Sequence, residues 1–361
     1  MKVLIVCSSF YPVNSPRSFR ATELAKELVR QGHEVVVYCA DTIHRDASIM
    51  QGFEFPIHIY HESKDVFAGK HDLLSRFLFK LSHDLLEYPR VSIMRTLPKA
   101  IKDEGGYDLL ISIAVPHPIH WAIGKMYQRG KRLAKVWVAD CGDPFMLAQS
   151  DHNHPFYFKY LEKIWCKYCD YISVPTEKAY LSYYPEFRDK IRVIPQGFNF
   201  DEVKLKDYRP NEVATFAYSG SFIQGIRDLR PVLDVIESLK VDFRFYVYTS
   251  QKSMLEPYES RLKGKLILSD YIERSELLYR LSGMDFLISL ENSGVSSQTP
   301  SKLIDYTLTK RPILSIDCLH INATLLNEFF AGNYHGQLVV NNIDRYSINN
   351  VVKQFVALAS N

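Results

Sequence analysis

The segment TPSKLIDY, residues 299–306, combines a helix start with groups that bind anions. Pro300 suits the first turn of a helix, because its missing N–H would be unpaired there and its φ angle is already helical. The free amides of Ser301, Lys302 and Leu303 would lie at the positive end of the helix dipole, and the Lys302 ammonium adds a full charge. The segment therefore predicts a site for a phosphate group.

Asp305 follows Ser301 by four residues, so both lie on one face of the predicted helix. Its carboxylate could accept hydrogen bonds from hydroxyl groups one turn below the anion. A ribose beside a diphosphate presents this pair of groups. The alternative is a capped surface helix on which Lys302 and Asp305 form an ion pair worth roughly 0.2–0.5 kcal/mol.

Two series of elements would position this helix. Short apolar runs alternate with segments of helical period, which is typical of parallel β-α-β units. Residues 196–212 lose this periodicity and turn polar, so we place a domain boundary there. We expect an α/β protein with a doubly wound, Rossmann-like domain over residues 1–200, a second over residues 201–344, and a helix over residues 345–361 that could return to the first. The expected strands are residues 2–6, 34–39, 108–114, 135–140, 170–174 and 191–195, then 214–220, 243–249, 265–270, 285–291 and 312–317.

Composition limits the class of protein. A net charge of +3 over 361 residues is too mild for a nucleic-acid binder. Six scattered cysteines, several of them in apolar runs, favour a reducing compartment over a disulfide framework, and the single CKYC at 166–169 lacks the second pair of a zinc site. MKVLIVC is too short for a signal-peptide core, and no run approaches the roughly 18 apolar residues of a spanning helix. We expect a cytoplasmic protein.

Four stretches share their order and spacing with a known family. They are FYPVNSPRSFRATELAKELVRQGHEVVVYC (10–39), VIPQGFNFDEV (193–203), FAYSGSF (216–222) and SLENSGVSSQTPSKLIDYTLTKRPILSID (289–317). In this order they resemble the opening unit, the linker, the first strand of the donor domain and the donor-binding segment of the retaining GT-B glycosyltransferases of family 4. The resemblance covers most of the chain and implies two Rossmann-like domains that face each other across a cleft.

The resemblance implies a hexosyltransferase that acts with retention. It would move a sugar from a nucleotide diphosphate sugar to a saccharide or lipid-linked acceptor, as in surface polysaccharide biosynthesis. No cofactor and no metal ion is implied, since cations and helix amides can serve the diphosphate.

The resemblance also assigns roles in the second domain. Arg227, at the usual position of a phosphate-binding cation, and Lys302 would offset the charge of the departing diphosphate. The alternative for Arg227 is an ion pair with Asp228 or Asp234. Asp305 would hold the ribose and Glu291 the sugar. The other predicted nucleotide-sugar-binding residues are Thr299, Pro300, Ser301, Leu303 and Gly220, with Tyr271 and Ile272 around the base.

The chain departs from the family pattern in two places. The family separates two glutamates by seven residues, whereas thirteen residues separate Glu291 from Asp305. The Gly-Gly turn after the first strand is replaced by Asn14, Ser15 and Pro16. A catalytically weak nucleotide-sugar-binding or scaffold protein therefore stays open, as does a nucleotide-sugar epimerase. A dinucleotide-dependent oxidoreductase is disfavoured, because no G-x-G-x-x-G follows the first strand.

In the first domain, two arginines flank the start of the first helix. Ligands bind beyond the carboxyl ends of parallel strands, and there the planar cations of Arg17 and Arg20 could reach a diphosphate across the cleft. Arg20 matches a family arginine, and we include it in the nucleotide-sugar-binding set. The alternative is a solvated arginine at the helix start, which we favour for Arg17.

Two further pairs of polar residues follow strands of the first domain. His117 and His120 come after the strand at 108–114, where either could face the sugar. Asp140 and Asp143 come at the end of the next strand, where either could orient an acceptor hydroxyl. We predict catalytic roles for His117 and Asp143. The alternatives are structural hydrogen bonds for the histidines and turn formation for the aspartates.

Residues 71–87 predict an amphipathic helix. Leu74, Phe77, Leu78, Leu81 and Leu85 lie on one face, and residues 64–102 hold eight Lys or Arg against four Asp or Glu. Such a surface could lie on the anionic inner face of a membrane, near a lipid-linked acceptor. The alternative is a helix that packs on the first sheet.

Overall fold

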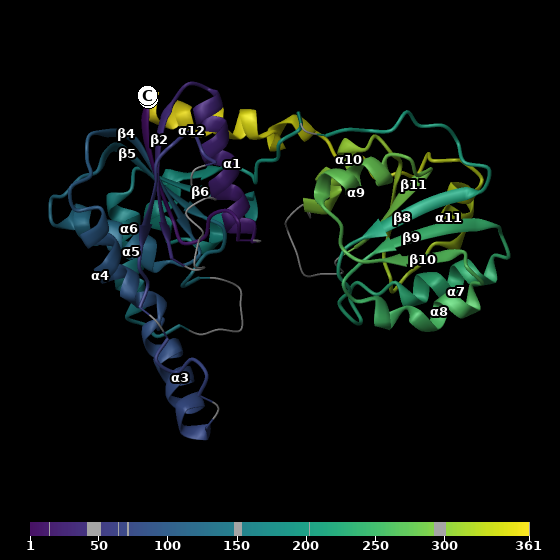
Figure 1. The fold of residues 1–361 in the computed structure, drawn as a ribbon, viewed down its shortest axis with the longest axis horizontal. Helices are drawn as coiled ribbons and strands as arrows, with labels where there is room; N and C mark the ends of the chain where they lie inside the picture. The colour runs from purple at the N-terminus through teal and green to yellow at the C-terminus, as the bar shows by residue number, and fades with distance from the viewer. Residues whose placement is uncertain are drawn as a thin grey trace. The chain divides into compact units, whose positions relative to one another are not determined.

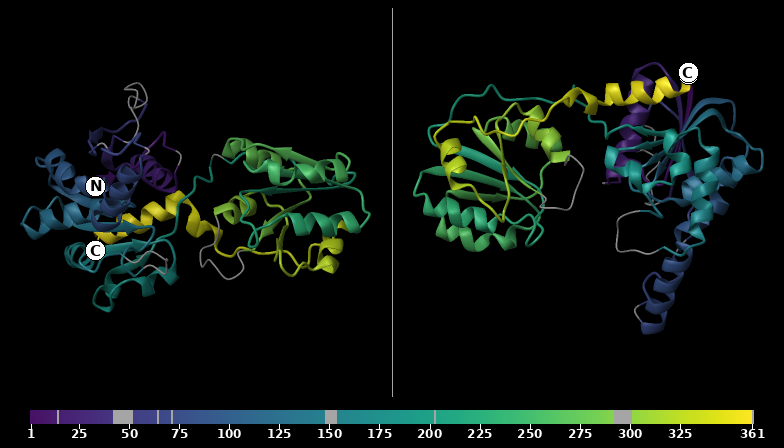
Figure 2. Two further views of the ribbon diagram at one scale, coloured as in Figure 1. Left: turned by 90° about the horizontal axis from the view of Figure 1, so that it is seen from below. Right: turned by 180° about the vertical axis from the view of Figure 1, so that it is seen from behind.

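The computed structural model describes residues 1–13, 15–41, 52–63, 65–70, 72–147, 154–201, 203–291 and 301–360, without the side chains of Lys178 and Ser301. Its internal contacts divide the chain into two units. The first unit contains Met1–Phe198 and Arg345–Asn361, and the second contains Asn199–Asp344. Each unit has a parallel β-sheet with helices on its faces, as predicted from the alternation of elements (Figures 1 and 2).

The first unit is built on a seven-stranded sheet with the order β3-β2-β1-β4-β5-β6-β7 among the described residues. Every neighbouring pair is parallel. The order reverses beside β1, so crossovers place helices on both faces and the central strands are apolar throughout. The strands are β1 (Lys2–Cys7), β2 (Glu34–Ala40), β3 (Ile57–Tyr60), β4 (Tyr107–Ala114), β5 (Ala134–Cys141), β6 (Tyr171–Val174) and β7 (Ile191–Val193).

The first helix of this unit shows why its sequence folds locally. Ser15 caps the helix by accepting a hydrogen bond from the Ser18 amide, and Pro16 occupies the first turn. The helices of the unit are α1 (Pro16–Arg30), α3 (Leu73–Leu86), α4 (Ile93–Ala100), α5 (Pro118–Gln128), α6 (Phe158–Tyr168) and α12 (Ile348–Ser360), with short 3-10 turns at Arg90–Ser92, Glu177–Ser182 and Pro185–Lys190.

The C-terminal helix α12 belongs to the first unit. Phe198 bonds the backbone on both sides of Ser347, through its amide to Tyr346 O at 2.8 Å and its carbonyl to Ile348 N at 2.9 Å. The helix then buries Val351, Val352 and Phe355 in the core that α1 shares with β1 and β4. The last helix therefore closes the unit in which the chain begins.

The second unit is built on a five-stranded parallel sheet with the order β10-β9-β8-β11-β12 among the described residues. Stacked phenylalanines, including Phe216, Phe245 and Phe286, fill one face of it. Its strands are β8 (Ala214–Ser219), β9 (Phe243–Tyr248), β10 (Leu266–Ser269), β11 (Phe286–Leu290) and β12 (Ile313–Ile316). Its helices are α7 (Arg230–Ser238), α8 (Glu256–Arg261), α9 (Arg274–Leu281), α10 (Ser301–Leu308) and α11 (Ala323–Phe330), with 3-10 turns at Lys252–Met254 and at Ile343–Tyr346, where the chain returns to the first unit.

Helix α3 does not pack on the sheet as the alternative reading required. Asp72 caps it, and it projects away from the rest of the first unit in Figure 1 and in the right view of Figure 2. None of its 14 residues is buried, and Leu73, Leu74 and Phe77 are 83%, 67% and 61% exposed. Among the described residues, no helix has the length and apolar character needed to cross a bilayer.

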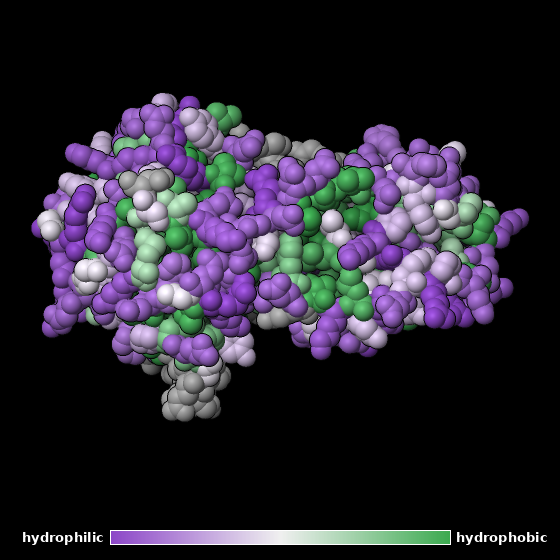
Figure 3. Space-filling model, turned by 90° about the horizontal axis from the view of Figure 1, so that it is seen from above, coloured by the Kyte–Doolittle hydropathy of each residue, from purple (hydrophilic) through white to green (hydrophobic). Residues whose placement is uncertain are grey.

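Two further features of the fold are the hydropathy of its surface and the burial of its cysteines. On the face drawn in Figure 3, hydrophilic side chains cover much of each unit, and hydrophobic side chains gather in a hollow of the second. All six cysteines lie among the described residues, where they are buried and form no disulfide. Burial raises the pKa of the Cys169 thiol to about 12.

The contact between α5 and α6 yields a prediction. A Cβ on Gly124 would lie 2.8 Å from both Cα and Cβ of Trp165, so the helices approach closely only because Gly124 has no side chain. We expect Gly124→Ala to lower the free energy of unfolding by about 1–3 kcal/mol, because the fully buried Trp165 must move. Urea denaturation measures the change. A Cβ on Gly105 meets nothing within 4 Å, so Gly105→Ala is the matched control, and equal losses in both variants would contradict the packing.

Candidate functional site

The carboxyl edge of the second sheet carries the residues around α10. Strand β8 ends at Ser219, whose backbone N–H donates a hydrogen bond to the Tyr306 hydroxyl of α10 at 2.7 Å. Tyr306 is buried, so this bond fixes the helix against the strand end. Gly220 follows with a φ of 144°, and a Cβ there would lie 3.2 Å from the Tyr218 hydroxyl. The position therefore favours glycine.

Lys302 and Arg227 are two cations that share this region, and neither forms an ion pair with a described residue. The Lys302 ammonium lies 4.8 Å from the centre of the Tyr218 ring. Lys302 Nζ and Arg227 Nε are both buried, and neither has a hydrogen-bond partner among the described residues. Burial, with the nearby charge of Arg227 as a second cause, lowers the pKa of Lys302 to about 8. Two neighbouring half-buried cations, each with a buried nitrogen that lacks a partner among the described residues, predict an anionic ligand.

The structural alternatives for these cations are wrong. Asp228 pairs with Arg230 at 2.6 Å and Asp234 pairs with Arg261 at 3.1 Å, so neither takes Arg227. The ion pair of Lys302 with Asp305, the alternative for α10, does not occur among the described residues, where Asp305 pairs with Arg274.

Asp305 is held by an arginine that sequence reasoning missed. Arg274, at the start of α9, donates from Nε at 3.0 Å and from Nη2 at 2.6 Å, and both bonds reach the same oxygen, Oδ1. Burial raises the pKa of Asp305, and the Arg274 charge opposes that rise. The pair orients the carboxylate along α10. No local sequence signal joins residues 31 positions apart.

The two predicted base-pocket residues precede α9. Ile272 is half-buried and packs in a cluster with Leu303 and Tyr306 of α10. Tyr271 is 56% exposed and lies close enough to Tyr218 and Tyr306 to raise the pKa of each, although burial is the larger cause. The structure thus brings Tyr271, Ile272 and Leu303 to the same side of the second unit as Lys302.

The structure describes some of the remaining predicted residues of this unit but not all of them. Glu291 directly follows β11, is exposed, and accepts a hydrogen bond from the Ser315 hydroxyl at 2.8 Å. Ser301 begins α10, which matches the expected helix start within a residue or two. Thr299 and Pro300 lie outside the described residues.

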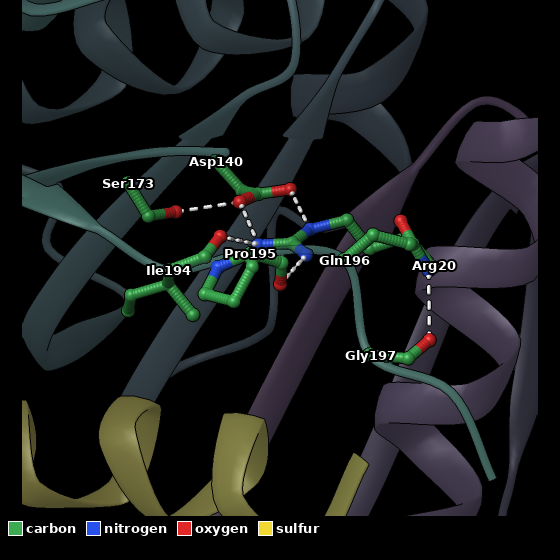
Figure 4. Close-up of polar contacts among 7 residues, drawn as sticks. All are labelled: Arg20, Asp140, Ser173, Ile194, Pro195, Gln196 and Gly197. Atoms are coloured by element: carbon green, nitrogen blue, oxygen red, sulfur yellow. Dashed lines mark hydrogen bonds and ion pairs between the residues drawn. The ribbon is translucent and has the colours of Figure 1, made fainter. Parts of the chain in front are cut away.

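Arg20 in the first unit has a different environment from the one we expected. It is buried and donates to both oxygens of Asp140, at 2.6 and 2.7 Å, and to the carbonyls of Ile194 and Pro195 (Figure 4). Ser173 donates to the same carboxylate at 2.5 Å. Burial alone would raise the pKa of Asp140, but the Arg20 charge and hydrogen bonds hold it below the usual value. These contacts use the guanidinium inside the unit, which argues against the predicted contact with a diphosphate and against a free Asp140.

His117 and His120 are also buried rather than open to a ligand. His117, the residue before α5, donates from Nε2 to the Asp143 carbonyl at 3.1 Å, and His120 Nδ1 lies 2.9 Å from the Ser112 hydroxyl. Burial lowers the pKa of His117 to about 3 and of His120 to about 4, so both are neutral at physiological pH. A base this weak argues against the predicted catalytic role of His117.

Arg17 and Asp143 occupy the accessible part of this edge. A Cβ on Gly142 would lie 1.7 Å from Arg17 Nη2, so the guanidinium rests on the backbone just after β5. Arg17 makes no hydrogen bond or ion pair with the described residues, and its charge contributes to lowering the pKa of Asp140 and of His117. The Asp143 residue is exposed. Of the two arginines, Arg17 is therefore the one available to a ligand.

The uncompensated charge of Lys302 yields a stability prediction. Between pH 8 and the unfolded pKa, the unfolded chain binds a proton that the folded chain has lost, so stability rises with pH in that window. The shift corresponds to roughly 3 kcal/mol of lost stability below pH 8. We expect Lys302→Met to raise the free energy of unfolding at neutral pH by about 1–3 kcal/mol, and this gain to fade as the pH approaches about 10. Urea denaturation of both proteins across this range measures it.

Lys204, an exposed residue of the linker, provides the control for that experiment. Lys204→Met removes the same charge without a desolvated ammonium and should leave stability within about 0.5 kcal/mol of the wild type. A Lys302→Met variant that is less stable than the wild type at every pH would mean that the ammonium has a stabilising partner.

Comparison with solved structures identifies the fold. The lipopolysaccharide outer core galactosyltransferase WaaB in its apo form matches with a TM-score of 0.61 and 13% identity, over 99% of each chain. A glycosyltransferase from Rickettsia africae matches with a TM-score of 0.62 and 14% identity, over 99% of this chain and 97% of that one. HepE from Anabaena, in complex with UDP, matches with a TM-score of 0.59 and 10% identity over the full length of both. At these identities the likeness establishes the fold, that of the GT-B glycosyltransferases.

Sequence comparison identifies the family. No curated protein matches the chain in sequence. The sequence model described as Glycosyltransferase Family 4 matches residues 19–202, which is more than half of the chain. The chain therefore belongs to Glycosyltransferase Family 4.

Proposed function

We propose that this protein is a retaining glycosyltransferase that moves a hexosyl group from a nucleotide diphosphate sugar to a saccharide or lipid-linked acceptor, in the assembly of a surface polysaccharide. The observation that carries the proposal is the pair of cations Lys302 and Arg227 near the start of α10, each with a buried nitrogen that has no hydrogen-bond partner among the described residues. Family membership supports it, and so do the structures of HepE with UDP and with UDP-glucose.

The donor would bind in the second unit. Its diphosphate would take the charges of Lys302 and Arg227 and the free amides at the start of α10. Asp305 would accept hydrogen bonds from the ribose hydroxyls through Oδ2, since both bonds from Arg274 reach Oδ1. The base would lie by Tyr271 and Ile272, and the sugar by Glu291.

In the transfer step, the main contribution of the protein would be to stabilise the negative charge of the departing diphosphate. The bond from the anomeric carbon to the diphosphate breaks, and the acceptor oxygen bonds the same face of that carbon. The departing diphosphate oxygen takes the proton of the acceptor hydroxyl. Lys302 and Arg227 would stabilise the negative charge that grows on the diphosphate. Arg17 and Asp143 of the first unit are our candidates for binding the acceptor.

A binding experiment tests the donor site. We expect Lys302→Ala and Arg227→Gln each to weaken UDP binding about 10- to 100-fold in calorimetry, because each removes a charge-assisted contact in a desolvated site. Turnover should fall at least as much. Lys204→Ala should leave binding unchanged. UDP, GDP, ADP and CMP compared by thermal shift would identify the base.

Product analysis then separates the possible activities. Wild-type affinity for every nucleotide in Lys302→Ala would contradict the donor site. A product of inverted configuration in nuclear magnetic resonance spectra would contradict retention, and turnover of donor without acceptor would favour an epimerase.

The pKa of Lys302 predicts how UDP binding depends on pH. A bound diphosphate favours the ammonium form, so affinity is full below pH 8 and falls as the pH rises above it. Lys302→Arg keeps its charge throughout and should give a flatter profile between about pH 7 and about pH 9. Identical profiles for the two proteins would show that Lys302 does not meet the diphosphate.

We also propose that helix α3 contacts an anionic membrane. Its exposed leucines and Phe77 lie near Arg76 and Lys80, and the exposed side chains of Phe156 and Tyr160 come from the segment that starts α6. Tyr157 in that segment donates to the Leu85 carbonyl of α3. A pocket of about 370 Å³ between them has an apolar lining: Phe67, Leu78, Leu81, Leu85, Leu86 and Tyr157, with Ser82. Aromatic and basic residues around an apolar helix are typical of a surface that enters the headgroup region.

Vesicle flotation tests this contact. We expect the wild type to float with vesicles that contain phosphatidylglycerol, and the double variant Leu74→Gln/Phe77→Gln to lose about 10-fold or more in affinity, because two exposed apolar side chains no longer enter the bilayer. Leu319→Gln is the matched control, since Leu319 is a similarly exposed leucine of the second unit. Equal flotation of all three proteins, or of none, would argue against α3 as the membrane contact.

A further inference from the structure

A pocket of about 550 Å³ lies at the amino edge of the second sheet, opposite the edge that carries Gly220 and Glu291. Asp285 directly precedes β11, Arg311 and Pro312 directly precede β12, and Tyr208 belongs to the segment that leads to β8. Thr307 and Lys310 bring the carboxyl end of α10 to the same pocket. The two ends of α10 therefore border two different places in the unit.

Arg311 is the main charged group of this pocket. Its guanidinium carbon lies 3.6 Å from the centre of the Tyr208 ring, so the two planes hold each other in place. Arg311 Nε is buried and has no hydrogen-bond partner among the described residues. The rest of the Arg311 side chain likewise forms no hydrogen bond or ion pair with a described residue. The guanidinium is thus positioned by stacking while its donors stay available.

The one carboxylate among the lining residues does not neutralise Arg311. Asp285 Oδ1 accepts from the Tyr208 hydroxyl at 2.8 Å and from Asn211, and Oδ2 accepts from the Thr215 amide at 2.7 Å. Through these bonds the Asp285 carboxylate contacts the segment that leads into β8 rather than Arg311. Lys310 is exposed and adds a second cation without a partner among the described residues, although the end of α10 offsets part of its charge. The pocket therefore favours a negatively charged ligand.

The other walls favour a ring with apolar faces. Tyr334 is half-buried, and Leu338, Val339 and Val340 follow it in sequence, with Leu338 N donating to Ile313 O of strand β12 at 2.8 Å. Gln337 adds an amide for hydroxyl groups. Pyranose rings present C–H faces to such side chains, and a uronate carboxylate matches the fork of a guanidinium. The volume lies within the range of roughly 300–1,000 Å³ that is usual for small-molecule sites.

We propose that this pocket is a second saccharide site that binds an acidic sugar chain, with a carboxylate on Arg311 and Lys310 and a sugar ring against Tyr334 and the Leu338–Val340 segment. The choice of a saccharide over another acid rests on the proposed function. The site would hold part of the acceptor or product chain away from the donor residues.

Calorimetry on the full chain tests the site, with trigalacturonate as the probe and its methyl ester as the neutral control. We expect Arg311→Gln to weaken trigalacturonate binding about 10-fold or more, Lys310→Gln to weaken it several-fold, and the neutral ester to bind about as weakly to the wild type as trigalacturonate binds to Arg311→Gln. Lys310→Gln changes an exposed side chain, so it reports on the site even if Arg311→Gln is unstable. Lys302→Ala should bind trigalacturonate like the wild type.

The outcomes separate this site from the donor site. Failure of trigalacturonate to bind the wild type at about 10 mM, equal affinity in Arg311→Gln and Lys310→Gln, or equal binding of the neutral ester would each overturn the inference. Competition of trigalacturonate by UDP that disappears in Lys302→Ala would place the ligand at the donor residues and overturn it as well. Loss of UDP binding in Lys302→Ala, with no trigalacturonate binding to the wild type, would support the proposed function and overturn the second saccharide site. If the protein binds trigalacturonate through Arg311 but binds no nucleotide, the second saccharide site is supported and the proposed donor site is contradicted.

Discussion

A charged side chain that is buried away from water needs an opposite charge or a set of dipoles around it. The first unit is organised around the buried charge of Arg20, which has both. Arg20 reaches from α1 to Asp140 on β5 and to the carbonyls of Ile194 and Pro195, which lead out of β7. Removal of either partner would leave the other charge buried, at a cost of about 3–5 kcal/mol. One ion pair thus holds together the first helix, the middle of the sheet and the chain segment that leaves for the second unit.

The same rule distinguishes cations that have a carboxylate partner from cations that have none among the described residues. Arg274 is matched by Asp305, and Arg230 by Asp228. Lys302, Arg227 and Arg311 have buried nitrogens without such partners among the described residues. Keeping them costs stability in the free protein, which is the usual compromise at a binding site. Charge compensation therefore says more about function here than the position of a residue near a strand end.

Most of the architecture could be predicted from the sequence, because buried parallel strands are continuous apolar runs and the start of α1 has its own capping residues. Strand β3 was missed, since four residues of mixed polarity carry too short a pattern. The candidate site was predicted less well. Arg17 and Arg20 stand in nearly the same local sequence, and only the fold shows that Asp140, 120 positions away, takes Arg20. Arg274 with Asp305 and Tyr208 with Asp285 are pairs 31 and 77 positions apart, which periodicity and spacing do not encode.

The buried thiols have a practical consequence. Because a maleimide reacts with the thiolate, and burial raises the pKa of Cys141, Cys166, Cys169 and Cys318, the native sulphur atoms should react slowly. New cysteines at exposed positions such as Lys131 in the first unit and Glu259 in the second would then take up spin labels selectively. Distances between such labels, with and without nucleotide, would show in solution whether the two units move relative to each other, without removal of any natural cysteine.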